Sequence, residues 1–93
     1  MGYWSGSGDY YDHRTRDNTT TWGLDFRHNM DLITNAIGIY STHYFTDRCL
    51  QVITNQNTSQ PLFLYEVYQA VHAGLSYDRL QAPPEIYRYI HSY

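Results

Sequence analysis

The sequence predicts an α/β fold, and two patterns support that prediction. An amphipathic stretch at residues 42–55 is followed by a continuous apolar run that begins after Pro61. A helix followed by a strand whose residues are continuously apolar, rather than alternately apolar and polar, is typical of sheets covered by helices on both faces. The length of 93 residues allows one compact domain at most. A hydrophobic content of 42% permits a core, but the mean hydropathy of −0.60 and 11 tyrosines make that core amphipathic.

The first 22 residues show no regular periodicity, which predicts loops with one short strand at most. Glycine and serine alternate there with aromatic side chains, and aromatic rings usually pack on something. The segment Gly23–Arg27 then alternates apolar and polar residues, which predicts a short edge strand.

The clearest predicted helix spans Thr42–Asn55. Its one apolar stripe, at helical spacing, consists of Phe45, Cys49, Val52 and Ile53. Ser41 or Thr42 is expected to cap its first backbone N–H groups. We interpret Cys49 as a small core residue rather than a nucleophile, because free cysteines are usually buried.

The predicted strand covers Leu62–Tyr68 and is expected to be buried on both faces. Ligands bind beyond the carboxyl ends of strands in open parallel sheets, and His72 follows this strand closely. Position alone is weak support for a functional histidine. A second, short helix is expected from Pro83, with Pro84 in its first turn and an apolar face of Ile86, Tyr89 and Ile90.

Composition and charge exclude several classes of function. The net charge of −3 argues against a protein that binds nucleic-acid phosphates, which would carry a basic stripe. No window reaches the roughly 18 apolar residues that a membrane span needs. The single cysteine cannot form an internal disulfide, and residues 1–9 show no signal-peptide pattern.

Weaker patterns leave alternatives open. His43 and Asp47 lie four residues apart on the predicted helix and could share a metal ion, although an exposed polar pair is the simpler interpretation. Asp9, Asp12 and His13 could also meet a cation, but a solvated loop is the safer interpretation. Asn18 and Asn57 each begin a glycosylation sequon. The tyrosine and tryptophan clusters would also suit a non-catalytic module that binds glycan or protein.

Five segments in the same order and at similar spacing resemble arylsulfatases of the B, I and J type. These segments, with the family patterns in parentheses, are Gly2–His13 (GYxxGxxDYYxH), Gly23–Arg27 (xLDFR), Tyr40–Arg48 (YSTxxFTxRA), Pro61–His72 (PLFLYLxxQxVH) and Leu80–Tyr87 (LQxPxxY). The resemblance covers nearly the whole chain.

The resemblance implies that residues 1–93 are a single partial segment of a catalytic domain, with no second domain. The implied fold is alkaline-phosphatase-like, a mixed sheet flanked by helices. The implied parent is a lysosomal or extracellular glycoprotein of the secretory pathway that hydrolyses aryl sulfates or sulfated glycans with calcium and a formylglycine. His72 matches the histidine that contacts the sulfate group in that family.

The chain also departs from the family pattern. The C-x-P-S-R motif that provides the formylglycine lies upstream of this segment in the family, and Cys49 stands where relatives have alanine. The calcium-binding Asp and Asn motifs of the family lie upstream and downstream of the segment, so no residue here is expected to be catalytic or to bind metal. Residues 74–79 form an insertion directly beside His72. We therefore expect this chain alone to be inactive.

Overall fold

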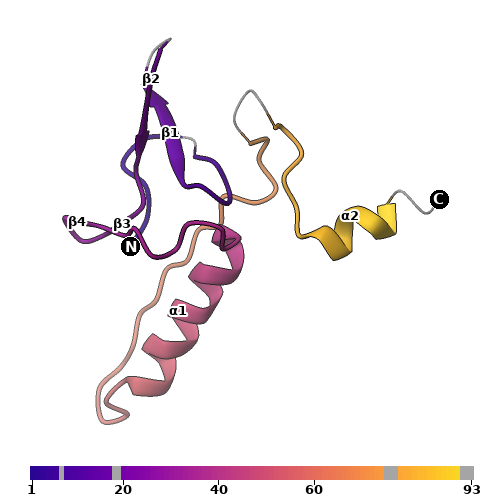
Figure 1. Cartoon of the computed structure of the whole chain (residues 1–93). Coiled ribbons are helices and arrows are strands. Elements are labelled where there is room, and N and C mark those ends of the chain that lie inside the picture. The colour runs from indigo at the N-terminus through magenta and orange to yellow at the C-terminus, as the bar shows by residue number, and fades with distance from the viewer. Residues whose placement is uncertain (7, 18–19, 75–77, 91–93) are drawn as a thin grey trace.

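The computed structural model describes residues 1–6, 8–17, 20–74 and 78–90. Two small hairpins and a long helix lie at one end of the molecule, and a short helix projects at the other (Figure 1). In chain order the elements are β1 (Arg14–Asp17), β2 (Thr21–Leu24), β3 (Arg27–His28), β4 (Asp31–Leu32), α1 (Ser41–Asn55) and α2 (Pro84–Ile90). Among these described residues, neither helix is long and apolar enough to cross a membrane.

Both described sheets are two-stranded and antiparallel. β1 pairs with β2, with Arg14 opposite Leu24, and β3 pairs with β4. The predicted strand at residues 23–27 is therefore only partly correct, because the chain leaves the β2 ladder at Asp25. The carboxylate of Asp25 accepts hydrogen bonds from the backbone N–H groups of Trp4 (2.9 Å) and Ser5 (2.8 Å). These bonds fasten the N-terminal loop to the hairpins.

The core is a small aromatic cluster around Phe26, which is fully buried. Its ring lies 5.3 Å from the ring of Tyr3, 5.2 Å from Tyr44 and 5.3 Å from Phe45. The angles with Tyr44 and Phe45 are 67° and 64°, the edge-to-face geometry that aromatic pairs prefer. Phe26 therefore joins the N-terminal loop, the second hairpin and the first turns of α1.

His13 is part of this core and has no exposed surface. Its ring stacks on Phe26 at 4.2 Å and 13°. Nε2 lies 2.9 Å from the carbonyl oxygen of Ala36, and Nδ1 lies 3.2 Å from the hydroxyl of Tyr3. A neutral ring satisfies both contacts, with Nε2–H donating to the carbonyl and Nδ1 accepting from the tyrosine. The expectation of a solvated loop at Asp9 and His13 is wrong, since both residues are buried.

Helix α1 confirms the predicted helix, but its packing differs from the prediction. Only Ser41 and Phe45 of this helix are buried. Cys49 and Val52 are half-buried, and Ile53 is exposed, because no further layer covers this end of the helix. Cys49 is therefore not a core residue.

The expected cap of α1 is absent. The N-cap position is Tyr40, and no side chain bonds to the first turn. Ser41 instead directs its hydroxyl at the amide oxygen of Gln69, 3.5 Å away. The hydroxyl of Thr42 is buried without a hydrogen-bond partner.

The predicted strand Leu62–Tyr68 is wrong, because residues 61–69 run extended but join no sheet. The segment passes back along α1 (Figure 1) and is fastened to it by polar contacts. The Tyr68 and Thr46 hydroxyls lie 2.9 Å apart, and the Cys49 thiol donates to Glu66. A strand buried on both faces needs neighbouring strands, and the described chain places none beside this segment.

Helix α2 confirms the predicted second helix but begins at Pro84, one residue after the predicted start at Pro83, and the carbonyl of Pro83 accepts from Ile86 N at 2.9 Å. Its predicted apolar face is not covered, since Ile86 and Tyr89 are exposed.

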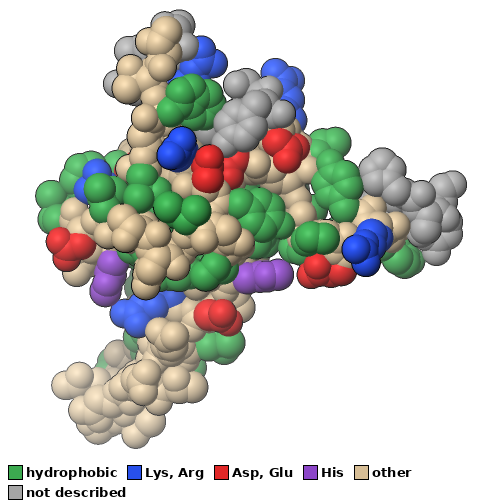
Figure 2. All heavy atoms as spheres, viewed as in Figure 1, with side chains coloured by type: hydrophobic (Ala, Val, Ile, Leu, Met, Phe, Trp, Pro, Cys, Tyr) green, Lys and Arg blue, Asp and Glu red, His purple; other side chains and the backbone are tan. Residues whose placement is uncertain are grey.

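The molecule is more open than a compact domain of its size. Its radius of gyration is 15.2 Å, against about 12 Å expected for 93 residues. Its accessible surface is 7111 Å², against roughly 5,600 Å² expected for 11.0 kDa. Hydrophobic side chains reach the surface over several elements (Figure 2), with Phe63 90% and Val71 100% exposed.

We expect the isolated chain to have little cooperative stability. The free energy gained by burying a small core must offset the entropy lost when the whole chain is ordered. Apolar side chains that stay exposed after folding add nothing to that gain. Thermal unfolding followed by circular dichroism and calorimetry should give a shallow transition. An unfolding enthalpy near the roughly 65 kcal/mol typical of a compact domain of this length would contradict this expectation.

Burial of His13 also predicts a pH dependence. Burial lowers the pKa of its ring below the ordinary value of 6.5. Below pH 6.5 the unfolded chain therefore binds a proton that the folded chain does not, so the folded population should fall as the pH falls from 6.5 towards the lowered pKa.

Histidine ring NMR resonances, titrated from pH 8 to 4, measure this directly. His13 is in the left-handed region (φ 57°), which asparagine tolerates well, so His13→Asn is the matched control. In this variant, the folded population should no longer fall through titration of residue 13 as the pH decreases below 6.5. A His13 midpoint at or above 6.5 would contradict the buried neutral ring.

Candidate functional site

The candidate site residue His72 lies in an irregular loop after the extended segment, with its side chain exposed. Its backbone N–H donates to the carbonyl of Gln69 at 2.9 Å. Its ring Nδ1 lies 3.0 Å from the carbonyl oxygen of Ala73, which is a hydrogen-bond distance. The prediction of His72 from its position assumed that residues 62–68 form a strand. Because these residues join no sheet, other contacts must hold His72 in place.

Tyr10 provides that cause. Its ring is 1% exposed and stacks on Tyr40 at 5.2 Å and 12°. Its hydroxyl donates to the carbonyl oxygen of His72 at 2.7 Å. Burial, the largest effect, raises the pKa of Tyr10 above 10.0, so the hydroxyl keeps its proton and remains a donor at neutral pH. The sequence analysis did not identify Tyr10 as a site residue. The signal that could have indicated it is the pair Tyr10–Tyr11 within the family-like segment Gly2–His13.

A second set of hydrogen bonds joins the same turn to the segment before α2. Gln81 accepts from the backbone N–H of Tyr10 at 2.8 Å and donates to the carboxylate of Asp9. The hydroxyl of Tyr11 donates to the carbonyl oxygen of Ala82 at 3.0 Å. The other oxygen of Asp9 accepts from Tyr11 N and Asp12 N at 2.8 and 2.7 Å. Residues about 70 positions apart are thereby held together.

These contacts border a cavity of about 550 Å³, which is within the range of roughly 300–1,000 Å³ typical of ligand pockets. Its polar lining residues are His72, Arg79 and Gln81. The remaining walls are aromatic and aliphatic, and include Tyr10, Tyr40, Leu80, Pro83, Ile86 and Tyr87. The cavity can therefore take a small, mostly apolar molecule with one polar end.

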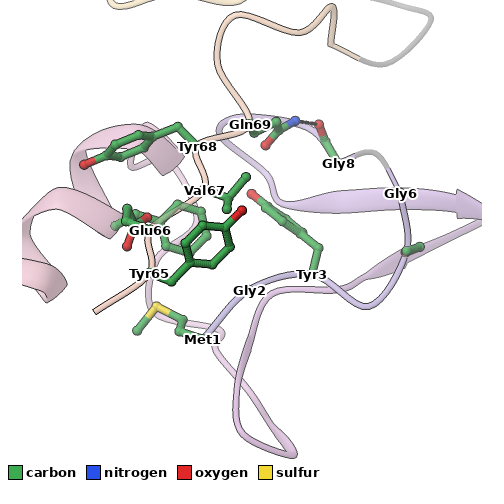
Figure 3. Close-up of a pocket in the computed structure, with 12 residues that line it drawn as sticks. Met1, Gly2, Tyr3, Gly6, Gly8, Tyr65, Glu66, Val67, Tyr68 and Gln69 are labelled. Carbon is green, nitrogen blue, oxygen red and sulfur yellow. Dashed lines mark hydrogen bonds between the residues drawn. The ribbon is translucent and has the colours of Figure 1, made fainter. Parts of the chain in front are cut away.

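A smaller cavity, of about 420 Å³, lies between the N-terminal loop and the extended segment (Figure 3). Tyr3 and Tyr65 border it, and Gln69 closes one side by donating to the carbonyl oxygen of Gly8. Among the described residues that line it, Glu66 has the one charged side chain.

The possible metal ligands are not brought together. Asp9 and His13 are engaged in the hydrogen bonds described above, and His43 packs edge-on against the ring of Tyr40 at 5.3 Å and 76°. No group of three His, Cys, Asp or Glu side chains among the described residues could hold a metal ion. Calcium takes six to eight oxygen ligands, so these residues do not fit it.

Cys49 does not fit a nucleophile either. Its thiol donates to the carboxylate of Glu66, and this hydrogen bond, with a smaller effect of burial, raises the thiol pKa above 9.0. The reactive thiolate is therefore a minor form at neutral pH.

Of the two predicted glycosylation sites, Asn57 is exposed in the turn after α1. Its side-chain oxygen accepts from the backbone N–H (3.1 Å) and the hydroxyl (2.8 Å) of Ser59. Asn18 lies outside the described residues.

Comparison with known proteins supports the resemblance. The chain is 39% identical over 88 residues to Arylsulfatase J of Mus musculus. The matched region is 94% of this chain and 14% of that relative, so the chain corresponds to a small part of it. No family model matches the chain, and no solved structure matches it.

The geometry predicts that Tyr10 positions the His72 loop. Tyr10→Phe keeps the stacked ring but removes the donor to the His72 carbonyl, at a cost of about 1 kcal/mol. By NMR, hydrogen exchange of the His72 amide should speed up. Tyr11→Phe, which removes the bond to Ala82 instead, is the matched control. Equal effects of both variants at residue 72 would contradict a specific role for Tyr10.

Proposed function

Because this chain is a sulfatase-family segment, we propose that it derives from an arylsulfatase, a sulfuric ester hydrolase with the alkaline-phosphatase-like α/β fold. The observation that carries the proposal is the similarity over 94% of the chain, within which His72 borders the larger cavity. The proposed substrates of the parent are aryl sulfates or sulfated glycans.

His72 is the proposed sulfate-binding residue. Nδ1 of its ring lies 3.0 Å from the carbonyl oxygen of Ala73, which leaves Nε2 as the ring nitrogen proposed to donate to a sulfate oxygen. Such a hydrogen bond would stabilise the charge that develops on the sulfate oxygens during ester cleavage.

The rest of the catalytic apparatus is proposed to lie in other parts of the parent. A formylglycine is the proposed nucleophile of the parent, and calcium is proposed to offset the sulfate charge. Neither Cys49 nor the described carboxylates fit these roles, for the reasons given above. The 93-residue chain alone is therefore proposed to be inactive.

The proposed location of the parent is the secretory pathway, either lysosomal or extracellular. The exposed Asn57 supports this location, because its sequon is accessible to glycosylation.

The coding sequence on both sides of this chain provides the first test. We expect an upstream C-x-P-S-R motif and a downstream Asp-Asn-Gly motif in the same frame. The longer protein should hydrolyse 4-nitrophenyl sulfate with calcium, and His72→Ala should lower its kcat about 30- to 1,000-fold, as loss of an oxyanion donor does. The 93-residue chain should show no turnover.

Two results would contradict this proposal. One is the absence of both motifs in the flanking sequence. The other is turnover by the 93-residue chain above that of its own His72→Ala variant.

A further inference from the structure

The extended segment at residues 62–68 has the features of a β-strand without a neighbour. We propose that it pairs antiparallel with the same segment of a second copy of this chain, so that two chains form a two-fold symmetric dimer. This inference is independent of the function proposed above, because it uses neither His72 nor the larger cavity.

The side chains of this segment alternate between two faces, as in a β-strand. Glu66 and Tyr68 point towards α1 and bond to its side chains, whereas Tyr65 and Val67 point towards the smaller cavity (Figure 3). The exposed fractions follow the same alternation, with 90%, 79% and 64% for Phe63, Tyr65 and Val67 against 40% for Tyr68. One face of the segment is therefore covered by α1, and the other is apolar and largely exposed.

The backbone of the segment is also unpaired. No backbone–backbone hydrogen bond joins residues 62–68 to the rest of the chain that the structure describes. A row of unpaired N–H and C=O groups is a template for another strand. The segment contains no proline or glycine, carries one charge, that of Glu66, and is rich in aromatic residues, a composition that favours strand pairing.

Charge selects the antiparallel arrangement. In a parallel, in-register pair each Glu66 would lie opposite its own copy, and like charges directly opposite each other are destabilising. An antiparallel pair centred on Tyr65 places Glu66 opposite Leu64 instead and opposes the whole of residues 62–68. It also sets Phe63 opposite Val67 and Tyr65 opposite Tyr65, and both are favoured cross-strand pairs.

The exposed surface is sufficient for a stable dimer. The accessible surface of the chain exceeds that of a compact protein of its mass by roughly 1,500 Å². A standard interface removes about 800 Å² from each partner. The proposed ladder adds roughly six to eight hydrogen bonds between the chains. Two copies can therefore cover this face without any other protein.

Sedimentation equilibrium of the 93-residue chain measures the association. We expect a dimer with a Kd on the order of 10 µM, at the weak end for an interface of this size. In a mixture of ¹³C-labelled and unlabelled chains, filtered NOEs should connect Phe63 of one copy to Val67 of the other. These residues are about 13 Å apart along one extended chain, so only a second copy gives this contact.

Charges placed at Tyr65 test the register. Tyr65→Lys and Tyr65→Glu each set like charges across the two-fold axis and should weaken association about tenfold or more. An equal mixture of the two variants should associate about as tightly as the unchanged chain. Met30→Lys, at an exposed side chain between β3 and β4, is the matched control and should leave the Kd unchanged. Unchanged Phe26 and His13 resonances in dilute samples show that each variant keeps the fold.

Each other outcome has a definite meaning. The inference is overturned by a monomer at about 1 mM chain, by association that Tyr65→Lys leaves unchanged, or by NOEs that join Phe63 to Phe63, as a parallel pair would give. Assemblies larger than a dimer also overturn it, because both edges of the segment would then pair.

A longer chain of the parent distinguishes this inference from the proposed function. If residues 62–68 are protected from hydrogen exchange in that chain while the 93-residue chain is a monomer, the parent's own sequence covers the segment. The dimer is then wrong, and the proposed function is unaffected.

Discussion

The rest of the structure depends on the packing of aromatic rings around Phe26. This one side chain contacts the N-terminal loop through Tyr3, the turn before β1 through His13, and helix α1 through Tyr44 and Phe45. The hairpins are too short to be stable alone, and α1 has only two buried residues. Removal of the Phe26 ring would therefore weaken the packing of all of these elements at once.

The candidate site is attached to this cluster by hydrogen bonds rather than by apolar packing. Tyr10 and Gln81 carry most of the connection, through the carbonyl of His72, the carboxylate of Asp9 and a backbone N–H. Hydrogen bonds fix distances closely but add little net stability in a partly exposed site. The geometry around His72 is thus well defined only while the few bonds to residues 9–11 persist.

Sequence reasoning predicts the local features of this chain well and the long-range ones poorly. The periodicity of α1 and the proline that begins α2 are local signals, and both elements form where expected. The apolar run at residues 62–68 predicts a buried strand, but burial depends on neighbours that the described chain does not supply.

The same division applies to the site. His72 was identified by position and resemblance, whereas Tyr10 and Gln81 were not identified. The roles of Tyr10 and Gln81 depend on contacts between residues 62 and 71 positions apart, which no local pattern encodes. The buried His13 shows the same limit, because its burial follows from stacking on Phe26 and not from its own polar neighbours. Asp9 is buried where the side chain of Gln81, 72 positions away, donates to its carboxylate.

The uncovered apolar segment at residues 61–71 also bears on the lifetime of the chain in a cell. Extended apolar backbone with side chains such as Phe63 and Val71 in solvent is what chaperones and proteases select when they sort incompletely folded proteins. At a given rate of synthesis, the steady-state amount of this chain would then fall as that segment is cleaved faster and rise as it is covered.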